Sequence, residues 1–149
     1  MIAYFDSSSI VKWFFDEIDS DLARNTKDHA DFSATSEIAY PEVMSAIHRA
    51  YREGCTTKED MVQARDEMER IWPDFILIKI SEKIIKQAGQ LIFKHGLRGF
   101  DSIHMSSAMS LRQNNTTDID IIFSCFDNRL NQAAQAEEFE CRSRKPIRR

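Results

Sequence analysis

Short apolar segments alternate with longer helical segments along this chain, and this alternation restricts the possible folds more than any other feature. Four apolar segments, at residues 2–5, 32–35, 75–80 and 119–125, have the length and the β-branched or aromatic content of strands. They are too apolar to have one face in water, so we expect helices to cover both faces of their sheet. The pattern predicts an α/β fold: a three-layer α/β/α sandwich with a central, mainly parallel sheet.

Helix signals fill the intervals between these strands. Apolar side chains recur at helical spacing, residues 56–60 form a capping-box start, Ser81 stands at an N-cap position, and Gly96 is placed to end a helix. The expected helices cover residues 10–15, 18–29, 36–53, 57–72, 81–95, 100–113 and 128–138. A short edge strand beyond residue 139 would complete the sheet.

A chain of 149 residues has the length of one domain, and no internal repeat divides it. We therefore place a single domain at residues 1–141 and a basic C-terminal tail at residues 142–149. Only four glycines are present, and their spacing forms neither a G-x-G-x-x-G motif nor a phosphate-binding loop. The sequence thus lacks the fingerprints of dinucleotide-binding and P-loop proteins.

The charge is unevenly distributed between these two parts. Residues 142–149 contain five of the 20 basic side chains and none of the 24 acidic ones, which leaves 15 positive and 24 negative charges in residues 1–141. A net charge of −9 argues at first against a nucleic-acid partner for this part of the chain. The argument weakens if some of these acids form a pocket that meets RNA through a divalent cation.

Three widely spaced cysteines, Cys55, Cys125 and Cys141, form no CxxC pair and no zinc-type spacing. Reduced thiols are typical of cytosolic proteins, so we expect a cytoplasmic location. No run of 18 apolar residues exists, and we therefore expect no membrane partner.

Three aspartates follow predicted strands or begin predicted helices: Asp6, Asp101 and Asp127. Each has a structural explanation, because Asp is a preferred N-cap residue that stabilises a helix by about 1 kcal/mol. Each also has a functional one, because sites in α/β sheets lie at the carboxyl ends of the strands.

Glu42 does not fit the capping explanation. Steps of four residues place it in one row with Ile38 and Ala46, on the apolar side of its predicted helix. A carboxylate on such a face requires a partner. One hypothesis is a buried salt bridge with Arg98 or Arg49, and the other is that Glu42 joins the aspartates around a cation.

A group of carboxylates at one edge of a sheet repels itself strongly. At an effective dielectric constant near 20, two carboxylates about 4 Å apart repel by about 4 kcal/mol. Oxygen ligands of this kind select Mg²⁺ or Mn²⁺ rather than zinc, and substrate phosphate oxygens complete the coordination of Mg²⁺. Such a site activates water for the cleavage of phosphodiester bonds.

Four segments resemble, in the same order, the motifs of the PIN-domain ribonucleases. They are YFDSSSIVK at residues 4–12, SEIAYPEVMSAI at 36–47, LRGFDSIHMSSA at 97–108 and FSCFDNRL at 123–130. Together they extend over nearly the whole chain. The chain is most similar to the VapC-type toxins of bacterial type II toxin–antitoxin systems.

The resemblance implies a Mg²⁺- or Mn²⁺-dependent endoribonuclease with a PIN-like fold. The family's catalytic acids carry over to Asp6, Glu42, Asp101 and Asp127, and Asp6 and Asp101 would hold the main metal. Ser8 matches a supporting hydroxyl within the family's site. The implied partners are the RNA substrate, a cognate antitoxin and a second copy of the chain in a homodimer. The helical pair at residues 36–72 is our candidate surface for the antitoxin or the dimer.

The last motif departs from the family pattern. Cys125 stands two residues before the last aspartate, where a hydroxyl is common, and Ser124 is the nearest candidate for a supporting hydroxyl. Arg98 and Arg129 flank the motifs and would contact RNA phosphates, unless they are solvated or bound in salt bridges. His104, three residues after the third acid, is more typical of a packed, hydrogen-bonded histidine than of a metal ligand.

Two other functions compete with this interpretation. A haloacid-dehalogenase-like phosphatase requires a second aspartate two residues after the first, where this chain has Ser8. A non-catalytic receiver-type signalling module requires paired acids after the first strand and an aspartate after a middle strand. Only Asp6 follows the first strand, and no aspartate ends the predicted strand at residues 75–80.

Overall fold

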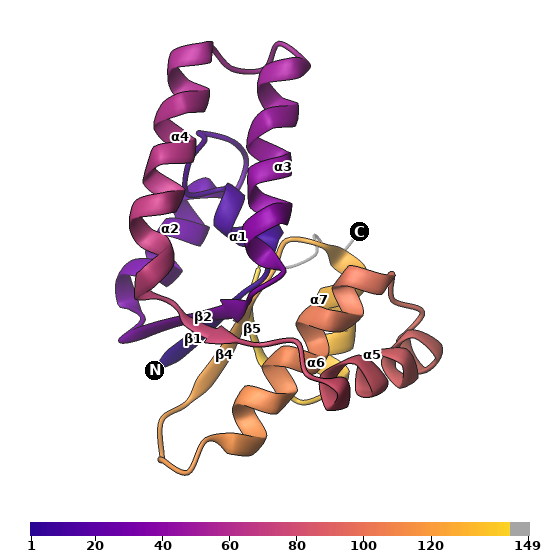
Figure 1. The fold of residues 1–149 in the computed structure, drawn as a ribbon. Helices are drawn as coiled ribbons and strands as arrows, with labels where there is room; N and C mark the ends of the chain where they lie inside the picture. Colours follow the sequence, from indigo (N-terminus) through magenta and orange to yellow (C-terminus); the bar gives the residue numbers. More distant parts are fainter. Residues whose placement is uncertain (144–149) are drawn as a thin grey trace, which may run out of the picture.

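Five parallel strands form one sheet in the computed structural model, which describes residues 1–143 (Figure 1). The strands are β1 (Ile2–Phe5), β2 (Phe32–Ser36), β3 (Ile76–Ile78), β4 (Ile121–Ser124) and β5 (Glu140–Arg142). Their spatial order is β3-β2-β1-β4-β5, and every neighbouring pair is parallel. The predicted central parallel sheet, including its edge strand beyond residue 139, is therefore confirmed.

Helices occupy the intervals between the strands, as the sequence predicts. They are α1 (Ser7–Val11), α2 (Ser20–His29), α3 (Ala39–Arg52), α4 (Lys58–Ile71), α5 (Glu82–His95), α6 (Gly99–Asn114) and α7 (Asn128–Ala136), and a 3₁₀ turn, η1 (Trp72–Asp74), follows α4. Thr57 caps α4 and Ser81 caps α5 through their side-chain oxygens. Gly96 ends α5 with a φ of 67°, a conformation that glycine adopts without steric strain.

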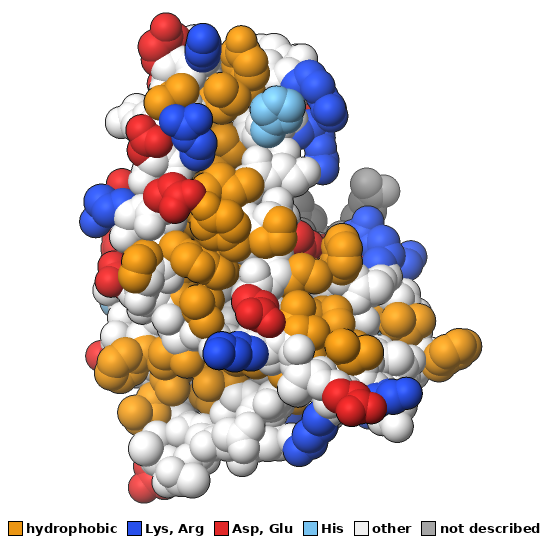
Figure 2. Space-filling view, viewed as in Figure 1, with side chains coloured by type: hydrophobic (Ala, Val, Ile, Leu, Met, Phe, Trp, Pro, Cys, Tyr) orange, Lys and Arg blue, Asp and Glu red, His pale blue; other side chains and the backbone are white. Residues whose placement is uncertain are grey.

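The sheet separates two apolar cores. Tyr4 and Phe123 face a core that contains residues of α5, α6 and α7, whereas Ala3, Phe5 and Ile122 face a core with residues of α1, α3 and α4. This alternation along β1 follows from the two-residue period of a strand, and it produces the predicted α/β/α layers. Figure 1 shows α3 and α4 side by side as a hairpin that extends away from the sheet. A band of apolar side chains runs along this hairpin (Figure 2).

Several predicted boundaries differ from the structure. The helix expected from residue 36 begins at Ala39, because Ser36 still belongs to β2 and pairs with Ile78. The first helix ends at Val11, where i→i−3 hydrogen bonds from Trp13 and Phe14 tighten the chain into a turn. The strands expected at residues 75–80 and 119–125 are both shorter, since pairing with their neighbours covers only their central residues.

The strand register brings two acidic segments together. Phe5 of β1 pairs with Ser124 of β4, so the chain leaves both strands at the same edge and reaches Asp6 on one side and Asp127 on the other. The strand β5 ends at Arg142, and residues 144–149 of the predicted basic tail lie outside the described residues. Within residues 1–143, no helix has the length and apolar character needed to cross a membrane.

Candidate active site

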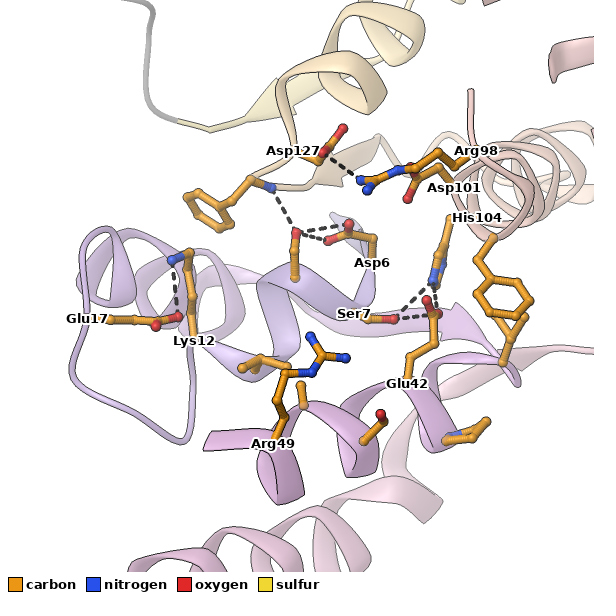
Figure 3. Close-up of a pocket in the computed structure, with 18 residues that line it drawn as sticks. Asp6, Ser7, Lys12, Glu17, Glu42, Arg49, Arg98, Asp101, His104 and Asp127 are labelled. Atoms are coloured by element: carbon orange, nitrogen blue, oxygen red, sulfur yellow. Dashed lines mark hydrogen bonds and ion pairs between the residues drawn. The ribbon is translucent and has the colours of Figure 1, made fainter. Parts of the chain in front are cut away.

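The four predicted acids meet at one cavity of about 690 Å³ at the carboxyl edge of the sheet. Asp6 follows β1, Glu42 lies in the first turn of α3, Asp101 lies in the first turn of α6, and Asp127 precedes α7. Figure 3 shows that their side chains come from opposite walls of this cavity. Four segments that are far apart in sequence thus contribute one carboxylate each.

Asp6 combines the capping role with a place in the cavity. Its Oδ1 accepts a hydrogen bond of 3.0 Å from the backbone N–H of Ser9, and the Ser8 hydroxyl donates to the same atom at 2.7 Å. Only 4% of Asp6 is exposed, and burial raises its pKa, although nearby His104 and the hydrogen bonds from Ser8 and Ser9 act in the opposite direction. A neighbouring cation stabilises the ionised form of a buried carboxyl group of this kind.

Asp127 and Asp101 share one arginine. Asp127 caps α7 by accepting a hydrogen bond of 2.9 Å from Leu130, as the capping explanation expects. For Asp101 that explanation is wrong, because the N-cap residue of α6 is Arg98. The guanidinium of Arg98 lies between the two acids, with its Nε 3.1 Å from Asp101 and a terminal nitrogen 3.1 Å from Asp127. The salt-bridging alternative for Arg98 is therefore what the structure shows.

Glu42 has partners that the sequence did not indicate. The expected salt bridge with Arg98 or Arg49 is wrong, since Arg98 binds the aspartates and the structure records no ion pair between Glu42 and Arg49. Instead, its Oε1 receives hydrogen bonds from Ser7 at 2.6 Å and from the His104 ring at 2.7 Å. Burial raises the pKa of Glu42, but His104 and Ser7 outweigh it, and the pKa is lowered overall.

Sequence reasoning did not select Ser7 or His104 for the site. His104 is packed and hydrogen-bonded, as expected, with 1% exposure, but its Nε2 points to a carboxylate of the cavity. A signal was available in the spacing, because residues three apart lie on one face of a helix and His104 follows Asp101 by three. Ser7 follows Asp6 directly and opens α1, which is where a turn brings side chains towards the strand end.

The family model of the PIN domain matches residues 3–136, which is most of the chain. The chain belongs to the PIN domain family. This confirms the resemblance inferred from the four motifs and the PIN-like fold, and it leaves the phosphatase and receiver alternatives without support.

Similar proteins of this family include two from Mycobacterium tuberculosis, named Ribonuclease VapC45 and Ribonuclease VapC49. Each is 31% identical over 135 residues, which cover 91% of this chain and 90% of the relative. Among solved structures, FitAcB from Neisseria gonorrhoeae aligns with a TM-score of 0.67 and 14% identity over 95% of this chain and 96% of the other. A toxin–antitoxin complex from Klebsiella pneumoniae aligns with a TM-score of 0.64 and 16% identity over 99% of both chains. These structures share the fold of this PIN domain.

Ser8 and Ser124 differ in their relation to the PIN-domain cavity. Ser8 donates to Asp6 and accepts the backbone N–H of Phe126 at 3.0 Å, so it connects the ends of β1 and β4 beside the site. Ser124 is fully buried, and its hydroxyl bonds to Ser9 at 2.7 Å rather than to any of the four acids. Ser124 therefore supports the turn that carries Asp6 and does not reach the cavity itself.

Cys125 occupies the place where a hydroxyl is common in the family. Its Sγ accepts the backbone N–H of Asp127 at 3.2 Å, so the thiol takes over the turn-forming hydrogen bond. Burial raises the pKa of this thiol far above its usual value, which keeps it neutral and unreactive. Asp127 is therefore held by a hydrogen bond from its backbone N–H although this position has a thiol in place of a hydroxyl.

Basic side chains surround the acidic centre of the cavity. Arg49 and Lys12 line it from α3 and the end of α1, and Lys12 forms an ion pair of 3.2 Å with Glu17 (Figure 3). Arg129 lies in an adjacent pocket and donates a hydrogen bond of 3.2 Å to the carbonyl of Gly96. Of the two predicted arginines, Arg98 therefore lies among the acids and Arg129 lies outside the residues that line the cavity. Sequence reasoning considered Arg49 only as a partner for Glu42.

The donor set of the cavity fits a hard divalent cation. Within residues 1–143, no three His, Cys, Asp or Glu side chains lie close enough to bind one ion together. Mg²⁺ in enzymes commonly uses one or two carboxylates and keeps several waters, so it does not need such a group. Two features suit such a cation. Asp6 is buried and has a raised pKa, and Asp101 and Asp127 already bind a positive charge, the guanidinium of Arg98.

Proposed function

We propose that this PIN-domain protein is a Mg²⁺- or Mn²⁺-dependent endoribonuclease and the toxin of a toxin–antitoxin pair. The observation that carries the proposal is the meeting of four carboxylates from four segments at one cavity. The 31% identity to two proteins named VapC ribonucleases, over nine-tenths of the chain, supports the activity. The structural likeness to proteins solved as toxin–antitoxin complexes supports the toxin role.

In the proposed reaction, Asp6 and Asp101 would hold the divalent cation and Asp127 would complete the acidic wall. The cation, when bound, supplies a water of lowered pKa and neutralises phosphate oxygens. Glu42 orients the attacking water and accepts its proton as the new bond to phosphorus forms. The bond to the ribose oxygen breaks, and this leaving oxygen takes a proton from solvent. The lowered pKa of Glu42 keeps it in the ionised form that this role requires.

Arg98 and Arg129 contact the phosphates of the RNA in this proposal. Replacement of Arg129 with Gln should weaken RNA binding and lower the slope of log affinity against log salt by about 0.7, the value for one phosphate contact on a single strand. The matched control is Arg65→Gln on α4, outside the residues that line the cavity. Filter binding of RNA by inactive protein at several salt concentrations measures both slopes. Equal slopes for the two variants would remove Arg129 from the RNA path.

A cognate antitoxin, a homodimer and a cytoplasmic location complete the proposal. The helical pair within residues 36–72 remains our candidate surface for the antitoxin or the second copy. A band of apolar side chains runs along it (Figure 2). Tyr51 of α3 is 39% exposed.

The direct test is a cleavage assay of the purified protein on total RNA with Mg²⁺, with Mn²⁺ or with EDTA. We expect discrete RNA fragments with either metal and intact RNA in EDTA. Cleavage that proceeds equally in EDTA would contradict the metal requirement. Intact RNA under all three conditions, from a folded and antitoxin-free protein, would contradict the nuclease assignment.

A further inference from the structure

Both hydrogen bonds to Glu42 converge on one of its two oxygens. Oε1 receives the Ser7 hydroxyl at 2.6 Å and Nε2 of His104 at 2.7 Å. Among residues 1–143, the hydrogen bonds to the Glu42 side chain are both to Oε1, and 23% of this side chain is exposed. One oxygen is therefore held by the protein, and the other is available to a water or a substrate.

His104 is held in turn from its opposite side. The hydroxyl of Tyr4 lies 2.8 Å from Nδ1 of His104, and the two rings pack edge to face. Tyr4 is fully buried and stacks on Phe123 with ring centroids 5.5 Å apart, so the phenol has little freedom to move. The hydroxyl of a tyrosine keeps its proton at neutral pH, so Tyr4 can act as a hydrogen-bond donor here.

These contacts favour one tautomer of the neutral ring. A phenol that keeps its proton can donate it to Nδ1, and Nδ1 then accepts and carries no hydrogen. The proton of a neutral imidazole is then on Nε2, which faces the Glu42 carboxylate at hydrogen-bond distance. The order of donors runs from Tyr4 through His104 to Glu42, from the core to the cavity.

We propose that His104 is a positioning residue of the proposed ribonuclease site, and that Tyr4 fixes the imidazole tautomer whose Nε2–H holds the Glu42 carboxylate in place. The role of Glu42 in this inference rests on the proposed function. The tautomer and its dependence on Tyr4 do not rest on it. A histidine that served packing alone would not need to donate its one ring N–H to a carboxylate of the cavity wall.

The first test reads the tautomer without any reaction. The ¹⁵N chemical shifts of the His104 ring, assigned by comparison with His104→Gln, should show a protonated Nε2 and an unprotonated Nδ1 at neutral pH. Tyr4→Phe keeps the stacked ring and removes the hydroxyl, and it should shift part of the population towards the other tautomer. A protonated Nδ1 in the parent protein, or no change in Tyr4→Phe, would overturn the role of Tyr4.

The second test asks whether His104 acts through Glu42. We expect His104→Leu to lower kcat by about 10- to 100-fold with KM within about twofold, as for residues that orient a catalytic group. The same change in a Glu42→Gln background should alter kcat by less than about twofold, because two changes that act through one group are not additive. Steady-state reactions with Mn²⁺ and a fluorescently labelled random-sequence oligoribonucleotide pool in excess over the protein measure kcat and KM.

Two further variants protect this test from a folding artefact. His104→Gln keeps a donor near the place of Nε2 and should recover most of the lost rate, whereas His48→Leu changes an exposed histidine on α3 and should leave it unchanged. Melting temperatures identify any variant that fails to fold, in which case His104→Gln and Tyr4→Phe carry the comparison. A loss from His104→Leu of equal size with and without Glu42 would show that His104 acts on the fold and would overturn the proposal.

Discussion

The Asp6→Asn variant should cleave RNA more than about 100-fold more slowly than the parent protein and should keep its fold. Replacing a residue that hydrogen-bonds to a metal ligand costs about 10- to 100-fold, and replacing the proposed ligand itself should cost more. Asn has nearly the shape of Asp and retains an oxygen for the N–H of Ser9, so the cap of α1 remains. It removes the charge that the proposed cation requires. The measurement is the cleavage rate on total RNA with Mn²⁺.

The same variant should be more resistant to heat than the parent protein at neutral pH in EDTA. Burial raises the pKa of Asp6 in the folded state. The stability that the protonated group contributes is complete below its unfolded pKa of about 3.9 and is lost as the pH rises through the raised folded value. Asn does not titrate, so the difference in melting temperature should be positive at pH 7 and shrink towards zero below about pH 3.9.

Asp120→Asn is the matched control for both measurements. Asp120 is exposed and precedes β4, at the end of the strand opposite to Asp127. Its replacement should change neither cleavage nor the melting temperature by a measurable amount. Cleavage by Asp6→Asn at the parent rate would refute the metal assignment, and an unchanged or lower melting temperature in EDTA would show that Asp6 acts as a cap alone.

Phe123→Ala should reduce the free energy of unfolding by about 3–5 kcal/mol, the range for a large aromatic side chain removed from a core. Phe123 is fully buried and contacts both Tyr4 and Phe139 through ring packing. Its loss leaves a cavity in the core that faces α5, α6 and α7 and removes the support of the Tyr4 ring. For a domain of this size, the melting temperature should fall by roughly 6–20 °C.

Phe93→Ala provides the comparison at equal chemistry. Phe93 is 94% exposed on α5, so its removal should change the stability by less than about 0.5 kcal/mol. Urea denaturation of both variants measures the difference. If the two variants were destabilised equally, Phe93 would be buried in solution by a second copy of the chain, or the core around Phe123 would be wrong.

Much of the fold and of the acidic site was predictable from local patterns. Strand and helix periodicity predicted the parallel sheet and its two helical layers, and Ser81 and Gly96 marked the ends of α5 correctly. Position in the sequence also indicated Asp6 and Asp127, because the residue after a parallel strand lies at the carboxyl edge of its sheet. Glu42 was indicated by a carboxylate on an apolar helix face, which required a partner.

The partners themselves were not predictable. For Glu42 the sequence left open a salt bridge with an arginine or a place among the aspartates around a cation, and the structure pairs it with His104, which lies 62 residues later in the chain. For Arg98 the sequence left open an RNA contact or a salt bridge, and the structure places its guanidinium between Asp101 and Asp127. Ser124 was expected near the acids and bonds to Ser9 in the core. Periodicity places a side chain on a face of its own element, but it contains no information on which face of another element lies opposite.

The sequence by itself determined the family, the layers of the fold and the identity of the four acids, because these depend on short-range spacing and on the order of motifs. Only the tertiary structure decided how those acids are paired and which oxygen of Glu42 remains open to the cavity. Hydrogen bonds and ion pairs act over about 3 Å, a distance set by strand register and helix packing between remote segments. In this protein, contacts at this distance give the four carboxylates different surroundings. Asp6 is buried, Asp101 and Asp127 bind Arg98, and Glu42 binds His104.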